Sequence, residues 1–249
     1  MTASEKTHKL PGVFPLLRDA IGLYRAHWDI FLGYAGWLFL PLILSLAAFL
    51  AFESETAQLV HAGFSQLLLI LLISWLHILV ILLVPLLNKD QPIPFHRIGK
   101  QAVALLIPYL ITTLVVEFFE LTGLILLIIP GLYIGTILAF APIITVRKGL
   151  GLIESIKASA ALSKGRVLAI LGRLLGGALV LGLVLLISWI GIEIARTLIA
   201  GGGLQGIFLS PPSLVTEIIY QALLVLFLPA FMIYHMLLYL ALDKFAKDS

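Results

Sequence analysis

The sequence of 249 residues is 61% hydrophobic and 12% charged, and its formal net charge is +3. Soluble domains typically carry about 25% charged residues, so this composition excludes an ordinary soluble domain and predicts a membrane protein. The sequence contains no cysteine, which excludes disulfides, Cys-ligated metal centres and thiol chemistry.

Lys and Arg are segregated along the chain. Fourteen of the sixteen fall in segments that share one side of a membrane if the chain crosses it six times. Cytoplasmic loops carry the excess of Lys and Arg, so both chain ends are predicted to be cytoplasmic. Basic residues in short loops beside a membrane favour anionic lipid headgroups as partners, and no nucleic-acid partner is expected.

Residues 1–29 are predicted to form a cytoplasmic segment that contains an amphipathic helix and no cleavable signal peptide. Its apolar side chains follow helical spacing, and basic side chains occupy the remaining surface. We expect Arg18 and Arg25 to contact lipid headgroups. The apolar positions are Val13, Leu17, Ile21, Tyr24 and Trp28.

The first two membrane helices are predicted over residues 30–52 and 64–87, because each stretch supplies the roughly 20 apolar residues that a crossing needs. Residues 53–63 contain two acidic residues and no Lys or Arg. This loop is therefore expected on the outer side.

Residues 101–146 form one apolar stretch that is long enough for two crossings, and the position of its turn has two solutions. A turn near Glu120 places Glu117 and Glu120 at the outer interface. A turn at Pro130 and Gly131 uses the strongest local helix breaker but places Glu117 deeper in the membrane. We favour the second solution.

The fifth and sixth membrane helices are predicted over residues 166–197 and 214–242, followed by a cytoplasmic tail over residues 243–249. Arg173 is expected to extend towards the cytoplasmic interface. Gly172 and Gly176 have the spacing that permits close helix packing, primarily within the chain and alternatively at a contact between two copies.

A second amphipathic helix is predicted before the fifth crossing, where Leu152, Ile153 and Ile156 oppose charged side chains. Lys157 and Lys164 on this helix are further candidates for headgroup contacts. The similarity between residues 17–21 and 153–157 suggests that one hairpin unit is repeated along the chain.

Ionisable residues within apolar spans are expensive and are therefore candidates for function. A small-solute or ion permease that uses acidic groups in its outer half is the alternative to a lipid-associated role. Interfacial solvation together with one ion pair, between Glu193 and Arg196 at i, i+3, is the simpler interpretation. The candidates are Glu117, Glu120, Glu193, Arg196 and Glu217.

His77 and His235 lie within predicted membrane helices and raise the question of a proton relay or a metal site. No metal-ligand spacing accompanies either residue, so a neutral histidine bonded to a neighbouring helix is favoured. The sequence has no catalytic motif of known spacing, and we expect neither a cofactor nor enzymatic activity.

Two long segments, residues 123–142 and 151–165, resemble the YciC-type family of bacterial inner-membrane proteins. Residues 17–19 and 24–25 also match that family. The chain is similar as well to the membrane domain of some glycerophosphodiester phosphodiesterases, but it has no room for their hydrolase domain. The resemblance implies a hairpin break at Pro130 and Gly131 and a location in the bacterial cytoplasmic membrane, and it transfers no catalytic residue.

Together these patterns predict an all-α protein of six transmembrane helices, with a membrane domain over residues 30–242 and amphipathic helices before the first and fifth crossings. The expected function is a non-enzymatic, lipid-associated role in the envelope of a bacterium. A homo-oligomer is compatible with this interpretation.

Overall fold

The computed structural model describes residues 10–51, 54–89, 91–199 and 214–247. These residues form helices and contain no strand. The elements are α1 (Val13–Ala26), α2 (Trp28–Ala35), the 3-10 helix η1 (Gly36–Leu38), α3 (Phe39–Ala51), α4 (Glu55–Leu87), α5 (Phe95–Ala104), α6 (Leu106–Leu126), α7 (Ile128–Leu138), α8 (Ala141–Lys148), α9 (Leu152–Ser163), α10 (Val167–Ile199) and α12 (Leu214–Lys247).

Six described helical segments are long and apolar enough to cross a membrane, which confirms the predicted all-α fold with six apolar spans. The segments are Trp28–Ala48, Thr56–Leu87, Leu106–Leu126, Ile128–Lys148, Val167–Ile199 and Ile218–Lys247.

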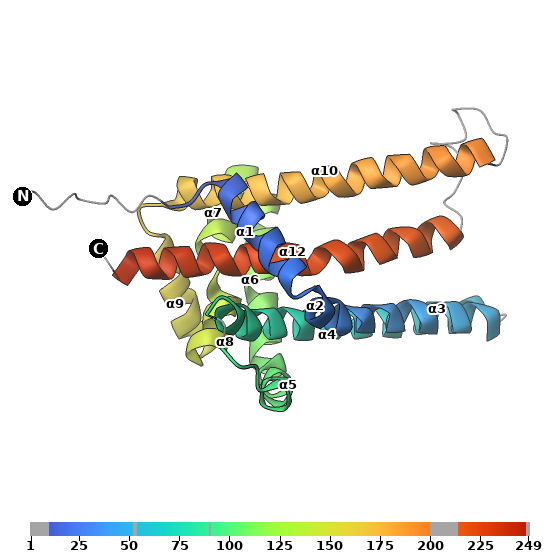
Figure 1. The fold of residues 1–249 in the computed structure, drawn as a ribbon, viewed down its shortest axis with the longest axis horizontal. Coiled ribbons are helices and arrows are strands. Elements are labelled where there is room, and N and C mark those ends of the chain that lie inside the picture. The colour runs from blue at the N-terminus through green and yellow to red at the C-terminus, as the bar shows by residue number, and fades with distance from the viewer. Residues whose placement is uncertain (1–9, 52–53, 90, 200–213, 248–249) are drawn as a thin grey trace, which may run out of the picture.

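Three long helices, α4, α10 and α12, define the long axis of the molecule (Figure 1). Helix α12 packs between α4 and α10, and α3 runs back along α4. At a rise of 1.5 Å per residue these helices are roughly 50 Å long, whereas the hydrocarbon core of a bilayer is roughly 30 Å thick. Each of the three therefore has turns to spare beyond a single crossing.

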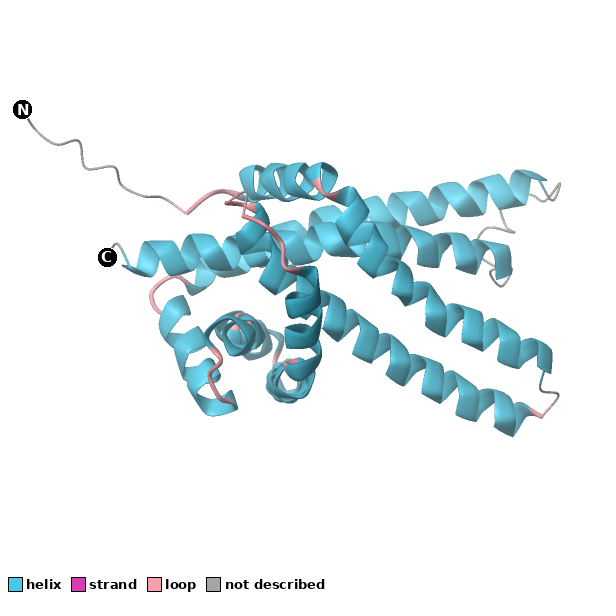
Figure 2. Cartoon of the chain, turned by 60° about the horizontal axis from the view of Figure 1, so that its bottom comes forward, coloured by secondary structure: helices cyan, strands magenta, loops and turns pink. Residues whose placement is uncertain are grey.

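The α6–α7 hairpin runs across the long helices and not parallel to them, and both views agree on this course (Figures 1 and 2). Helix α6 packs against α4, and α7 packs against α10. The hairpin thus bridges two helices that lie on opposite sides of α12.

The turn between α6 and α7 is at Leu127, whose extended backbone separates two helices. The favoured turn at Pro130 and Gly131 is therefore wrong by three residues. Proline is tolerated in the first turn of a helix, where its missing N–H has no intrahelical acceptor, and Pro130 occupies that turn of α7. Gly131 instead packs beside α6: a Cβ there would lie 2.5 Å from the backbone nitrogen of Leu124.

The apolar core lies where the C-terminal halves of α4 and α12 meet. Leu79 and Ile81 of α4 and Tyr234 and Leu238 of α12 are fully buried there. Phe140, at the start of α8, completes the core. This end of the molecule is consequently packed like the interior of a globular protein.

Helix α10 extends away from this core and exposes large apolar side chains. Leu179, Ile187, Leu198 and Ile199 are exposed along it. Large apolar side chains without protein neighbours need another apolar solvent, and a lipid bilayer supplies it.

A short helix precedes each of the three hairpins: α1 precedes α2 to α4, α5 precedes α6 and α7, and α9 precedes α10 and α12. This order fits the predicted repeat, although a helix over Phe95–Ala104 was not expected. The predicted amphipathic character is not confirmed. In α9 the buried face is a stripe of Ser155, Ser159 and Ser163, while Ile153 is 59% exposed.

Several predicted boundaries shift. Helix α4 begins at Glu55 instead of residue 64, and α12 continues to Lys247 through most of the predicted tail. The connection between the fifth and sixth predicted membrane helices falls almost entirely within residues 200–213, which lie outside the described residues.

Candidate functional site

Helix α1 lies against α12 and α10 with one face and leaves the opposite face exposed. Leu16 and Ala20 are buried on the packed face. The exposed face carries Phe14, Arg18, Ile21 and Arg25 at i, i+4, i+7 and i+11, which places apolar and cationic side chains in one stripe. Phe14 is 76% exposed and the side chain of Arg18 is 82% exposed.

This stripe differs from the apolar face predicted for the segment. Of the five predicted positions, Val13, Leu17 and Tyr24 are only partly exposed because they pack towards the protein, whereas Ile21 and Trp28 are exposed. Both headgroup candidates, Arg18 and Arg25, are exposed as required for lipid contact, and Arg18 also forms a surface ion pair with Asp19 at 3.4 Å.

Two sets of hydrogen bonds hold the N-terminal segment against the membrane helices. The hydroxyl of Tyr24 donates to the carbonyl oxygen of Leu226 at 2.9 Å. Arg173 donates from Nε to the carbonyl of Pro11 at 2.7 Å and from Nη2 to the carbonyl of Leu10 at 2.9 Å. Arg173 therefore binds the chain that leads into α1 and does not extend freely towards the interface.

Lys157 and Lys164, the other headgroup candidates, are exposed on and just after α9. Both views place α9 and α1 on different sides of α12 (Figures 1 and 2). The four basic candidates therefore form two separate groups.

The predicted carboxylates on α6 differ in environment. Glu117 is exposed, whereas Glu120 is partly buried. A Cβ on Gly135 of α7 would lie 2.7 Å from Cδ of Glu120, so the carboxyl group fits into the space that this glycine leaves.

Glu193 and Arg196 form the predicted ion pair near the opposite end of the molecule, on α10. The distance from Nε of Arg196 to Oε2 of Glu193 is 2.7 Å, and their side chains are 23% and 2% exposed. Oε1 of Glu193 is buried without a hydrogen-bond partner. Because Figure 1 shows this end of α10 far from α6, the acidic residues on these two helices do not line one common vestibule.

Glu217 belongs to α12, but its side chain lies outside the described part of the structure.

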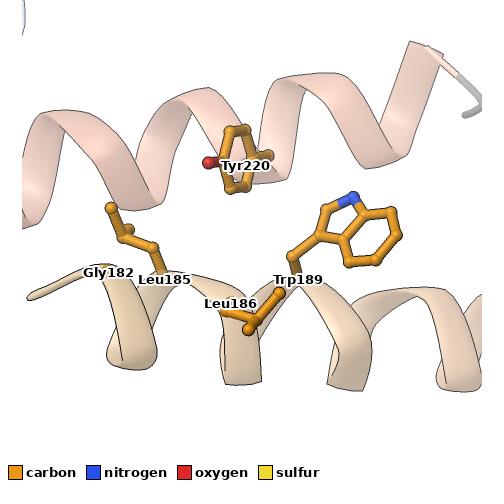
Figure 3. A pocket seen from close by; sticks show the side chains of 5 residues that line it. All are labelled: Gly182, Leu185, Leu186, Trp189 and Tyr220. Carbon is orange, nitrogen blue, oxygen red and sulfur yellow. The ribbon is translucent and has the colours of Figure 1, made fainter. Parts of the chain in front are cut away.

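An open apolar groove of about 390 Å³ lies between α10 and α12 (Figure 3). Gly182, Leu185, Leu186 and Trp189 line one wall from α10, and Tyr220 of α12 lies across from them.

His77 of α4 and His235 of α12 come together in the core, with ring centroids 6.0 Å apart. The hydroxyl of Tyr109, from α6, lies 2.7 Å from Nδ1 of His77. Phe140 packs on the other histidine with a centroid distance of 5.4 Å. The favoured interpretation, a histidine hydrogen-bonded between helices, fits His77, but sequence spacing gave no sign that the two histidines would meet.

A chain of buried hydroxyl groups continues from α6 into α8 and α9. Thr112 and Thr145 lie 3.1 Å apart through their Oγ1 atoms, and Oγ1 of Thr145 donates to Oγ of Ser155 at 2.9 Å. Ser159 donates to the carbonyl of Ile137 at 2.7 Å. Ser155 and Ser159 of the serine stripe thus attach α9 to the core by hydrogen bonds, which explains why they face inwards.

Charges at the C-terminal end of α12 join it to α8. Asp243 lies 3.3 Å from Nζ of Lys148 and 2.7 Å from Nζ of Lys247. Near the same helix end, the guanidinium of Arg166 lies 4.2 Å from the ring centroid of Phe245. Basic residues from two predicted cytoplasmic segments, the one between the fourth and fifth spans and the C-terminal tail, therefore gather at this end of the molecule.

No protein-family model, curated protein or solved structure matches the chain. The resemblance to the YciC-type family therefore stays a prediction from sequence.

Proposed function

We propose that this protein is a non-enzymatic integral protein of the bacterial inner membrane that associates with anionic lipid headgroups at the cytoplasmic face. Helix α1 is the element that makes this contact. The main observation in support is the exposed stripe of Phe14, Arg18, Ile21 and Arg25 on this helix.

The composition of the stripe supports a lipid partner. A helix that lies in the membrane interface places apolar side chains among the acyl chains and cationic side chains among the headgroups. Each Lys or Arg near an anionic leaflet contributes about 1 kcal/mol of attraction. Neither of the two arginines is buried in protein, so both are available to headgroups.

The way α1 is held supports a defined contact as well. Tyr24 and Arg173 fix the two ends of the segment through hydrogen bonds to backbone carbonyls. A helix fixed in this way loses little further conformational freedom when lipid binds, and this lowers the entropic cost of the contact.

The proposal is tested by measuring which lipids the protein retains. The full-length protein is reconstituted in mixed vesicles of phosphatidylglycerol and phosphatidylcholine, and spin-labelled lipids report the protein-bound fraction. We expect enrichment of phosphatidylglycerol for the wild type and loss of this enrichment for the double variant Arg18→Glu and Arg25→Glu.

The matched control is Arg18→Lys with Arg25→Lys, which keeps both charges and should keep the preference. A wild type without preference for the anionic lipid, or a charge-reversed variant that behaves like the wild type, contradicts the proposal.

A further inference from the structure

We propose that His77 and His235 bind one monovalent soft metal ion, Cu(I) or its redox-inert analogue Ag(I), through their Nε2 atoms. This inference is independent of the lipid contact of α1, because it concerns the core between α4, α6 and α12.

The distance between the rings fits a shared ion. An imidazole nitrogen binds a metal at about 2.0 Å and lies about 1.1 Å from the centre of its ring, so two rings on one ion have centroids at most roughly 6.3 Å apart. The observed separation of 6.0 Å is just inside this limit. At this separation, an ion shared by the two Nε2 atoms would hold them in a nearly linear arrangement.

Both Nε2 atoms lack a partner. Each is buried and takes part in no hydrogen bond. Leaving such a group unpaired costs about 1–3 kcal/mol.

The second nitrogen of His77 is already engaged. Nδ1 lies 2.7 Å from the hydroxyl oxygen of Tyr109, which fixes the orientation of the ring. Histidines that bind metals almost always hold their other nitrogen in a hydrogen bond of this kind. When Nδ1–H donates to Tyr109, the lone pair of Nε2 is free for a metal ion.

The surroundings select an ion of low charge. Phe140 packs on His235 and Tyr239 packs on Phe140, so the site is enclosed by aromatic rings. The described residues contain no cluster of three or more His, Asp or Glu that would complete a tetrahedral centre. The cost of burying an ion rises with the square of its charge, so an uncharged pair of ligands favours a monovalent ion over Zn²⁺.

The residues beside His235 on α12 also favour a soft monovalent ion. Two of the three methionines in the chain, Met232 and Met236, flank His235 at i−3 and i+1, and both are buried. Thioether sulfur is a soft ligand that selects Cu(I) over harder divalent ions. Met232, three residues before His235 on α12, is the candidate for a third ligand.

The test uses the purified full-length protein, freed of metal with a chelator and titrated with Cu(I) under anaerobic conditions against a chromophoric bicinchoninate competitor. We expect one Cu(I) per chain. His77→Gln and His235→Gln should each weaken binding by more than 100-fold, and Tyr109→Phe should weaken it by about 10- to 100-fold. The exposed His96 of α5 supplies the matched control, His96→Gln, which should leave binding unchanged.

X-ray absorption of the Cu(I)-loaded wild type keeps the proposal testable if a core variant fails to fold. A first shell of two imidazole nitrogens, with or without one sulfur, supports the proposal. An oxygen-rich shell, equal affinity for Zn²⁺, or undiminished binding in folded His77→Gln protein overturns it.

Discussion

Gly177 of α10 lies directly against the ring of Tyr234 of α12: a Cβ added to the glycine would meet Cε1 of the tyrosine at 2.5 Å. The ring has no freedom to withdraw, because Tyr234 is fully buried and its hydroxyl donates to the carbonyl of Arg173 at 2.6 Å. The close contact between α10 and α12 therefore requires glycine, which has no side chain, at position 177.

Gly177→Ala is expected to lower stability by about 1–3 kcal/mol, because a core that receives an extra methyl group must shift its neighbours. Thermal unfolding of the detergent-solubilised protein measures the change. Gly172→Ala is the matched control on the same helix, since a Cβ there meets nothing within 4 Å. It should be neutral or raise stability by up to about 1 kcal/mol through helix propensity. Equal effects of the two substitutions would refute this account of the packing.

The ion pair on α10 predicts an asymmetric response. Arg196→Met leaves the 2% exposed carboxylate of Glu193 without its cation, whereas Glu193→Gln leaves a more exposed guanidinium. Arg196→Met should therefore be the more destabilising of the two, by roughly 1–3 kcal/mol after allowance for partial exposure. Arg196→Lys keeps the charge and should fall between wild type and Arg196→Met. The reverse order in chemical denaturation would contradict the assignment of Glu193 as the buried partner.

Alkaline pH should loosen α1. Burial raises the pKa of the Tyr24 hydroxyl above its ordinary value of 10.0, so folding favours the protonated form, which donates to Leu226. A raised folded pKa means that this stabilisation is complete below about pH 10 and is lost as pH rises through the folded pKa. Protease cleavage of the N-terminal segment, followed from pH 8 to 11, should therefore accelerate at the upper end.

Tyr24→Phe provides the comparison for this pH effect. It lacks the hydroxyl and should show faster cleavage at pH 8 and a smaller acceleration above pH 10 than the wild type. A variant with the same pH profile as the wild type would show that other groups control the release of α1.

The sequence predicted the apolar spans well, because hydropathy over some 20 residues measures the property that a membrane selects. It did not predict the course of the α6–α7 hairpin across the long helices. That course depends on which faces of the helices meet. A span of Leu and Ile is apolar on all its faces, so its sequence does not indicate which face packs against a neighbouring helix. The turn at Leu127 was missed for a related reason: Pro130 is a strong helix breaker inside a helix, but it is tolerated in the first turn.

The sequence was less informative about candidate sites. It identified Glu193 and Arg196 as a pair because they are three residues apart on one helix. It gave no reason to join His77 and His235, which come from different hairpins and meet only through the packing of α4 against α12. For the proposed metal site, the sequence carries one signal in the position of Met232 and Met236 beside His235, in a chain with only three methionines.

The central claim is that the basic helices lie at the cytoplasmic face, where anionic headgroups reach them. The absence of cysteine from the sequence makes single-cysteine labelling a direct test. Variants carrying Arg18→Cys, Lys157→Cys or Ser54→Cys are treated in intact cells with a membrane-impermeant maleimide, before and after permeabilisation. The account predicts that Ser54→Cys, between α3 and α4, reacts in intact cells and that the other two react only after permeabilisation. Labelling of Arg18→Cys or Lys157→Cys in intact cells would contradict it.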